Sequence, residues 1–222
     1  MRENIIQVKE VDKDGRTHVE GDWYSKGLPK NIVLSDTVYV ETSYGFSTFY
    51  SQDEKGLIID QASGCYQIVD FIVSEKGKVS IGKFSVINGA TIVCNSSITI
   101  GNHCMLAWSS VITDTWFDIS TSPIEVRQEL LINVSKNSLR SFPITGKPMP
   151  VILEDNCWVG FGAIIMPGVR LGRGSVVGCK TVILEDVPPY AVITGSPAKI
   201  VKFLNPDDTN EFKEKTLQEY LQ

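Results

Sequence analysis

Histidine is scarce in this 222-residue chain, which contains only His18 and His103, far apart in the sequence. A metal centre built from several imidazoles, such as that of a zinc carbonic anhydrase, is therefore excluded. The five cysteines include no CxxC pair, and an odd number in a chain of this length is typical of reduced thiols. The sequence thus predicts no metal site and a cytoplasmic location.

Long apolar runs and basic runs are also missing. No stretch approaches the ~18 apolar residues of a membrane span, and residues 1–6 lack the features of a signal peptide. The 21 basic and 26 acidic residues leave a net charge of −5 with no basic cluster, which argues against nucleic acid or an anionic membrane surface as a partner. No glycine-rich loop indicates a fused nucleotide-binding domain.

The chain does contain a period of six. Neither an α-helix nor an alternating strand has this period, whereas a chain that turns a corner every six residues does. A compact residue follows each of the first five aliphatic positions by four places, where it would fill the space beside a corner. The aliphatic positions of the clearest stretch are Leu153, Val159, Ile165, Leu171, Val177 and Ile183.

The same phase recurs upstream, faintly at Leu34 and Val40 and then in sets of three. Three faces of six residues make one coil of a triangular prism, so we predict an all-β parallel β-helix of about five or six coils over residues 31–202. The cysteines at 65, 104 and 157 fall on inward positions and are predicted to be core residues. The inward sets are 59/65/71, 81/87/93, 100/106/112, 153/159/165 and 171/177/183.

Three segments do not follow the repeat. Residues 1–30 predict an arm with a hairpin that turns at Asp14-Gly15. Residues 119–151 interrupt the prism with a capping box at 122–125 and a short helix; a loop this long is typical of a lid or binding element, with a tolerated surface insertion as the alternative. Residues 203–222 predict a C-terminal helix.

One long stretch resembles a known family. The run LEDNCWVGFGAIIMPGVRLGRGSVVGCKTVILEDVPPYAVITGSPAKIVK (153–202) is similar to the hexapeptide-repeat acyltransferases, especially the maltose, galactoside and polysaccharide O-acetyltransferases, as are Gly146-Lys147-Pro148 and the coil at 100–112. The resemblance implies the left-handed form of the β-helix. It also implies a homotrimer with active sites between neighbouring prisms, and acetyl-CoA or another acyl-CoA as the acyl donor.

The resemblance further implies where the donor binds. Trp158 matches a tryptophan that walls the acyl-transfer groove, and the family usually has threonine and lysine where this chain has Leu184 and Glu185. The negative charge of Glu185 at this position is expected to affect how strongly CoA binds. The positions implied to line the pantetheine arm are Gly160, Phe161, Gly178 and Cys179, and those implied to meet the phosphates or the adenine end are Lys199 and Lys202.

The histidine that serves the family as catalytic base is missing. Its position, just past Ile112, falls on Phe117 or Asp118. A sugar hydroxyl needs a general base, whereas a neutral amine attacks a thioester directly. We therefore expect N-acylation, or O-acylation through Asp114 or Asp118, with Trp116 and Phe117 in contact with the acceptor.

With that histidine missing, His103 is the remaining candidate base, but its outward position on a corner is typical of a surface histidine.

The chain as a whole is predicted to be an acyltransferase for an amine or hydroxyl of a sugar or another small acceptor. The alternative is a catalytically silent β-helix trimer that acts as a binding or assembly subunit.

Overall fold

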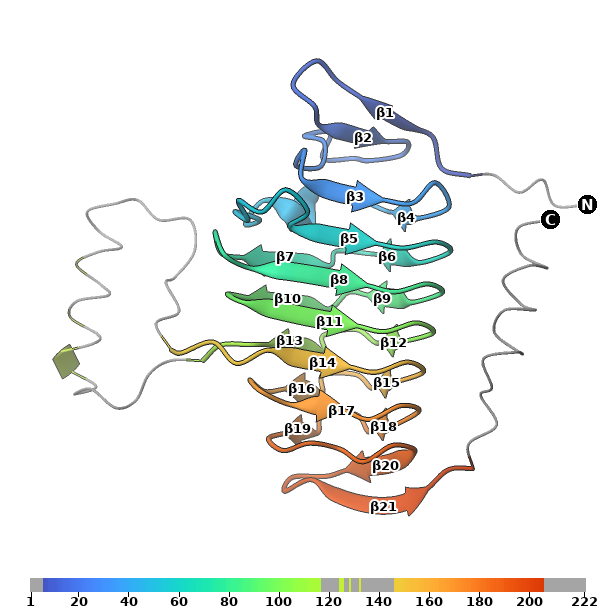
Figure 1. Cartoon of the computed structure of the whole chain (residues 1–222), viewed down its shortest axis with the longest axis vertical. Helices are drawn as coiled ribbons and strands as arrows, with labels where there is room; N and C mark the ends of the chain where they lie inside the picture. Colours follow the sequence, from blue (N-terminus) through green and yellow to red (C-terminus); the bar gives the residue numbers. More distant parts are fainter. Residues whose placement is uncertain (1–5, 117–123, 126–127, 129–131, 133–145, 206–222) are drawn as a thin grey trace, which may run out of the picture.

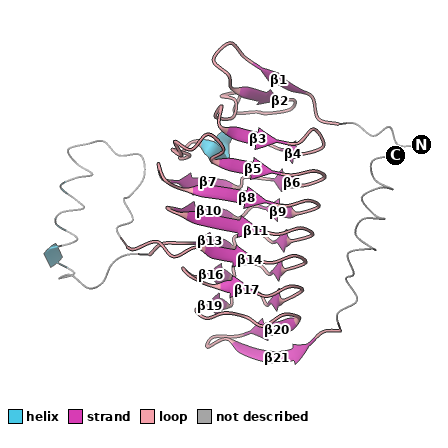
Figure 2. Ribbon diagram, viewed as in Figure 1, coloured by secondary structure: helices cyan, strands magenta, loops and turns pink. Residues whose placement is uncertain are grey.

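The computed structural model describes residues 6–116, 124–125, 128, 132 and 146–205. Short strands wind into a prism of six coils (Figures 1 and 2). Figure 1 shows the chain crossing the near face from left to right, returning behind it and stepping down the axis, which is a left-handed coil. The fold is therefore the predicted left-handed parallel β-helix.

Each side of the prism is one sheet, numbered here in the order in which the chain meets it within a coil. The first face contains β3 (Ile32–Leu34), β5 (Leu57–Ile59), β8 (Lys78–Ile81), β11 (Ser97–Ile100), β14 (Val151–Leu153) and β17 (Arg170–Leu171). The second face contains β4 (Tyr39–Val40), β6 (Gly64–Tyr66), β9 (Val86–Asn88), β12 (Met105–Leu106), β15 (Trp158–Val159), β18 (Val176–Val177), β20 (Ala191–Thr194) and β21 (Lys199–Phe203). The third face contains β7 (Asp70–Val73), β10 (Thr91–Cys94), β13 (Val111–Thr113), β16 (Ile164–Ile165) and β19 (Val182–Ile183).

Three corners separate these faces. The first corner joins the first and second faces, the second corner joins the second and third faces, and the third corner leads from the third face into the next coil. All strands within the coils pair in parallel, and the antiparallel pair β20–β21 closes the C-terminal end. Because each coil stacks on the last, residues at one corner of successive coils form a column along the prism.

The inward positions of the six-residue period form the core. In the five predicted sets, every inward side chain except one is at most 2% exposed, including those of Cys65, Leu106 and Ile183. The predicted cysteines at 104 and 157 are also buried. Burial of these stacked aliphatic columns is the main source of stability for the prism.

One inward position was predicted wrongly. Ile92, not Val93, is fully buried and pairs in register with Phe71 and Ile112. The second corner of this coil is one residue shorter than the others, with Ala90 buried at the corner itself. The step from Ile87 to the next inward residue is therefore five, and the period loses its phase for one face.

The N-terminal arm contains the hairpin at the place where the sequence predicts it. Strands β1 (Lys9–Val11) and β2 (Thr17–Val19) pair antiparallel. The 3-10 helix η1 (Tyr44–Phe46) stands where the first coil would have a third-face strand. Asp22 links arm to prism, because its Oδ1 accepts from Thr42 Oγ1 at 2.9 Å and from the backbone N–H of Ser43 at 3.0 Å.

The insertion leaves the prism after β13 and returns at β14 (Figure 1). Residues 124–125, 128 and 132 are helical and exposed, within the range where the capping box predicts a short helix. The rest of that predicted helix, and the C-terminal helix beyond residue 205, lie outside the described residues. Among the described residues no helix is long and apolar enough to cross a membrane.

Buried thiols should make the protein less stable at alkaline pH. Burial raises the pKa of Cys65 to about 12, and burial together with the charge of Asp114 raises that of Cys94 to about 12. Between their ordinary value of 9.0 and these values, the unfolded chain has lost both protons while the native chain keeps them, so stability falls as the pH rises. Each thiol contributes a slope of about 1.4 kcal/mol per pH unit.

Urea denaturation at pH 8, 9 and 10 under reducing conditions measures this slope. The Cys65→Val variant keeps an apolar side chain of similar size and removes one titrating group, so its slope above pH 9 should be shallower by about 1.4 kcal/mol per pH unit. Equal slopes for the two proteins would contradict the assignment.

Candidate active site

Asp114 lies at the third corner, directly after β13, and is completely buried. Its Oδ1 accepts hydrogen bonds from the backbone N–H of Asn95 at 2.8 Å and from Thr115 Oγ1 at 2.7 Å. Its Oδ2 accepts from the backbone N–H groups of Ser96 and Ser97 at 2.7 and 2.9 Å. The carboxylate thus holds the corner of the preceding coil, and its role as a base stays a prediction.

The two ends of the insertion meet beside Asp114. The backbone N–H of Met149 donates to the carbonyl oxygen of Asp114 at 2.7 Å, and that of Gly168 donates to Met149 at 3.0 Å. Gly146 lies so close to Trp116 that a Cβ added to it would stand 1.6 Å from the Trp116 carbonyl oxygen. Trp116 and Met149 expose their side chains at this corner. The predicted site residues Phe117 and Asp118 lie outside the described residues.

The second corner carries a different set of aromatic side chains. Trp158 points outward from β15 and is 52% exposed, between Met105 on β12 and Val176 on β18. Phe161, at the corner that follows, stacks on Trp108 of the preceding coil with ring centroids 5.1 Å apart and planes 8° from parallel. These side chains form an apolar surface along the second face and its corner.

Trp108 was not predicted, although the repeat contains the signal for it. Trp108 follows the inward Leu106 by two positions, as Phe161 follows the inward Val159. Equal offsets from inward residues in adjacent coils place two side chains one above the other. The register of the repeat therefore predicts the stacked pair once its phase is known.

The next coil packs so closely on Gly160 and Gly178 that neither position has room for a side chain. A Cβ on Gly160 would lie 2.9 Å from the backbone nitrogen of Cys179, and one on Gly178 would lie 2.5 Å from Thr194 Oγ1. Their own N–H groups donate to the carbonyl oxygens of Val177 and Ile193 in the next coil. A donor bound here would meet the exposed Cys179 rather than free N–H groups of these glycines.

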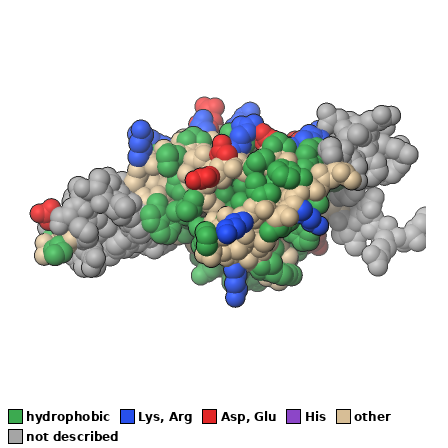
Figure 3. All heavy atoms as spheres, turned by 90° about the horizontal axis from the view of Figure 1, so that it is seen from below, with side chains coloured by type: hydrophobic (Ala, Val, Ile, Leu, Met, Phe, Trp, Pro, Cys, Tyr) green, Lys and Arg blue, Asp and Glu red, His purple; other side chains and the backbone are tan. Residues whose placement is uncertain are grey.

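A cavity of about 620 Å³ opens at the C-terminal end of the prism. It lies between the loop after β19, including Leu184 and Glu185, and the turn of the β20–β21 hairpin. Lys199 and Lys202 are exposed on β21, and no carboxylate lies within 4 Å of either amine in the described part of the chain. Figure 3, seen from this end, shows apolar side chains with basic and acidic ones among and around them.

The structure does not bring all the predicted site residues together within one chain. Trp158, Phe161 and Cys179 belong to the second face and second corner, whereas Asp114 and Trp116 belong to the third corner. The whole width of the third face separates the two groups, since β13 and β16 lie between the corners. The 620 Å³ cavity follows the third corner, two coils beyond Asp114.

Neither histidine lies at these corners. His103 is at the first corner, where its ring stacks on Phe84 with centroids 5.0 Å apart. His18 belongs to the N-terminal hairpin, and its Nε2 lies 2.9 Å from Asp12 Oδ2. The described residues also contain no group of three or more side chains that could hold a metal ion.

With this geometry in view, residues 150–185 match the model of the bacterial transferase hexapeptide, a unit of six repeats. This segment carries the hexapeptide repeat of bacterial transferases. The resemblance drawn from the sequence is thereby confirmed.

Curated relatives share the repeat to different extents. Galactoside O-acetyltransferase of Escherichia coli is 25% identical over 191 residues, which are 84% of this chain and 86% of the relative. A Schizosaccharomyces pombe protein is 32% identical over 120 residues, 54% of this chain and half of its own length. The 2,3,4,5-tetrahydropyridine-2,6-dicarboxylate N-acetyltransferase of Clostridium perfringens is 49% identical over 53 residues, 24% of this chain and 22% of that enzyme.

Solved structures agree on the fold. A hexapeptide-repeat acetyltransferase of Vibrio cholerae superposes with a TM-score of 0.52 and 24% identity, covering 72% of this chain and 77% of its own. An N-acyltransferase of Bacillus cereus superposes with a TM-score of 0.58 and 16% identity, covering 84% and 87%. At these identities the likeness establishes the left-handed β-helix.

Proposed function

We propose that this chain is an acyltransferase that moves an acetyl group from acetyl-CoA to an amine or hydroxyl of a sugar or another small acceptor. The observation that carries the proposal is the exposed Trp158, fixed on a strand of the hexapeptide repeat. The chain also aligns with a galactoside O-acetyltransferase over 84% of its length. An indole on a strand offers a flat apolar wall for an acyl thioester.

We further propose that the site forms between copies of the chain in a homotrimer. The second corner of one prism would face the third corner of its neighbour, which places Trp158 and Cys179 opposite Trp116 and the base of the insertion. Two observations support this arrangement: the third face separates these groups in one chain, and the second corner exposes Trp108 and Phe161. Large exposed apolar patches mark interaction surfaces.

The donor would then lie along the groove between the two corners. Pantetheine would pass Cys179 and reach the C-terminal cavity, with Lys199 and Lys202 available to its phosphates. Glu185 lines that cavity and opposes a phosphate placed inside it. The phosphates are therefore expected on the lysine side of β21, outside the cavity.

The environment of Asp114 favours an amine acceptor. In N-acylation the amine nitrogen attacks the thioester carbonyl carbon, the C–S bond breaks, and CoA leaves as the thiolate. The proton lost by the amine reaches the sulfur through a carboxylate or water, so that CoA is released as the thiol. An amine needs no strong base for this attack, whereas a hydroxyl does. Asp114 already accepts five hydrogen bonds inside the prism, one of them from the Cys94 thiol, so Asp118 is the remaining aspartate proposed to orient the acceptor.

Acetyl-CoA binding and turnover test the proposal together. We expect saturating acetyl-CoA to raise the melting temperature by about 5 °C or more, and thiol release with amino sugars to exceed that with neutral sugars. Trp158→Ala should weaken both effects, while Trp23→Ala, which removes an exposed indole at the opposite end, should weaken neither.

The same experiment distinguishes the silent alternative. Sedimentation should give a trimer in every case. A trimer that responds to neither acetyl-CoA nor longer acyl-CoAs, and that releases no thiol with any acceptor, would mean a binding or assembly subunit instead.

A further inference from the structure

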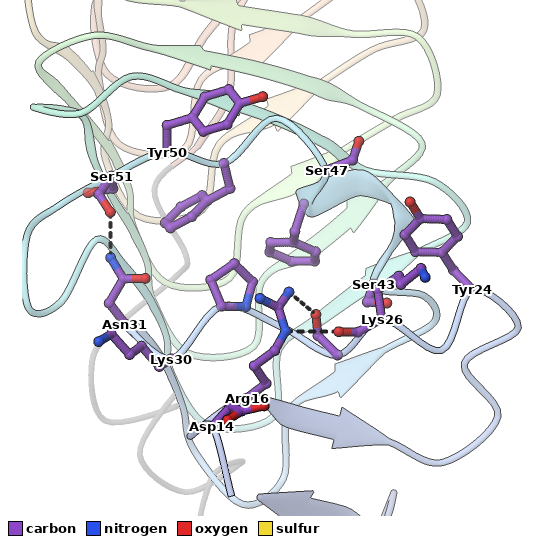
Figure 4. A pocket seen from close by; sticks show the side chains of 14 residues that line it. Asp14, Arg16, Tyr24, Lys26, Lys30, Asn31, Ser43, Ser47, Tyr50 and Ser51 are labelled. Atoms are coloured by element: carbon purple, nitrogen blue, oxygen red, sulfur yellow. Dashed lines mark hydrogen bonds between the residues drawn. The ribbon is translucent and has the colours of Figure 1, made fainter. Parts of the chain in front are cut away.

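A second cavity lies at the N-terminal end of the prism, at the opposite end from the C-terminal hairpin (Figures 1 and 4). Its volume is about 750 Å³, within the range of roughly 300–1,000 Å³ that is usual for small-molecule sites. The walls are the N-terminal hairpin and its following loop on one side, and residues 43–51 on the other. The proposed transfer reaction does not use this N-terminal cavity.

The N-terminal cavity is positively charged in a chain whose net charge is −5. Arg16, Lys26 and Lys30 line it, against a single acid, Asp14. None of the three cations has a carboxylate oxygen within 4 Å among the described residues, where the ion pairs are found elsewhere. Uncompensated cations around one concave surface attract an anion.

Arg16 is held in place by its own loop. Its Nε donates to the carbonyl oxygen of Lys26 at 2.9 Å, and its Nη2 donates to that of Gly27 at 2.7 Å. A guanidinium has five N–H groups, so these two bonds orient the group and leave others for a ligand. Figure 4 shows Arg16 between Tyr24 and Lys26 at one end of the cavity and Lys30 and Asn31 at the other.

Rings and hydroxyl groups complete the lining. Phe46 and Phe49 are buried, with centroids 6.4 Å apart, and present an apolar floor. Tyr24 and Tyr50 add a ring and a hydroxyl each, and Ser47 adds a hydroxyl on the exposed side. Aromatic faces beside several hydrogen-bonding groups suit the mixed apolar and hydroxyl surface of a sugar ring.

The walls are fixed by hydrogen bonds that are partly or fully buried. The Asn31 side-chain amide donates to the carbonyl oxygens of Ser51 and Asp53, each at 2.8 Å. Ser51 Oγ in turn donates to the carbonyl oxygen of Gly77 at 2.7 Å. A preformed cavity loses little conformational freedom when a ligand enters.

We propose that the N-terminal cavity binds an acidic sugar, that is, a saccharide ring that carries a carboxylate or a phosphate. Arg16, Lys26 and Lys30 would hold the anionic group, and the tyrosine rings and the Ser47 hydroxyl would contact the sugar ring. This site stands independently of the proposed transfer, since its lining includes none of the residues proposed for that reaction.

Isothermal titration calorimetry of the full chain tests the proposal with five probes: glucuronic acid, glucose 6-phosphate, glucose, inorganic phosphate and adenosine monophosphate. We expect saturable binding of one or both acidic sugars that weakens as salt rises, and no saturable binding of glucose. The preference between the first two identifies the anionic group. Phosphate or the nucleotide binding as tightly as either acidic sugar would overturn the sugar assignment.

A matched pair of variants locates the site. Lys26→Gln/Lys30→Gln changes two exposed side chains and should lower the affinity for the acidic sugar roughly tenfold, with an unchanged melting temperature. Lys76→Gln removes an exposed lysine outside the cavity and should leave the affinity unchanged. Absence of saturable binding by both acidic sugars, or equal affinity in the double variant and the wild type, would overturn the proposal.

Discussion

Replacement of Asp114 by alanine is expected to lower the free energy of unfolding by about 4 kcal/mol. The substitution leaves the partly buried backbone N–H groups of Asn95, Ser96 and Ser97 without the acceptor that the fully buried Asp114 provides. Each buried donor that loses its partner costs about 1–3 kcal/mol. Asp114→Asn should be destabilising too. One carboxylate oxygen becomes an NH2 group, which cannot accept the hydrogen bonds that the oxygen accepted.

Asp186 provides the matched control for this prediction. It also caps a corner, but its carboxylate is exposed and accepts one backbone hydrogen bond, from Arg170 at 2.7 Å. Asp186→Ala should therefore lower stability by less than about 1 kcal/mol. Urea denaturation followed by circular dichroism measures both values. If Asp114→Ala were as stable as the wild type and yet inactive, the carboxylate would act in the chemistry rather than in the corner.

Gly146→Ala is expected to lower turnover about a hundredfold while the prism stays folded. The new Cβ would lie 1.6 Å from the Trp116 carbonyl oxygen, so the two ends of the insertion must move apart by more than an ångström. A displacement of about 1 Å in a catalytic arrangement costs on the order of 10²-fold in rate. Trp116 and Asp118, which are proposed to contact the acceptor, belong to the end of the insertion that this displacement would move.

Lys147→Ala changes the neighbouring residue, whose side chain is exposed, and should leave turnover near that of the wild type. Melting temperatures measured beside the kinetics separate displacement from unfolding. Full activity in Gly146→Ala would show that the insertion carries no group needed for transfer.

The period of six predicted the fold because corners are local. An aliphatic residue at every sixth position must point inward if the chain turns at that interval, and no distant partner has to be known. The prediction was wrong only where Ala90 shortens one corner, since a run of β-branched residues offers either Ile92 or Val93 as the inward side chain. The six-residue period of the other coils places Ile100 correctly as the next inward residue, where it pairs with Ile81.

The candidate site was less accessible to prediction, for a different reason. Trp158 and Phe161 could be placed on the outside of the prism from their offset to Val159. Their separation from Asp114 by a whole face depends on which strand each residue occupies within the coil. The Asp114 carboxylate accepts hydrogen bonds from backbone N–H groups 17–19 residues earlier in the chain. Because every residue except proline has such a group, the sequence does not indicate which ones meet Asp114.

The sequence by itself determined the all-β prism, its inward columns and the family of its repeat, because a local period dictates a stack of identical coils. Only the tertiary structure decided which residues share a corner, and it revealed the cationic N-terminal cavity. Arg16, Lys26 and Lys30 come from the arm, while Phe46 and Tyr50 come from the first coil. No periodicity joins these segments, so their contact exists only once the hairpin packs on the end of the prism.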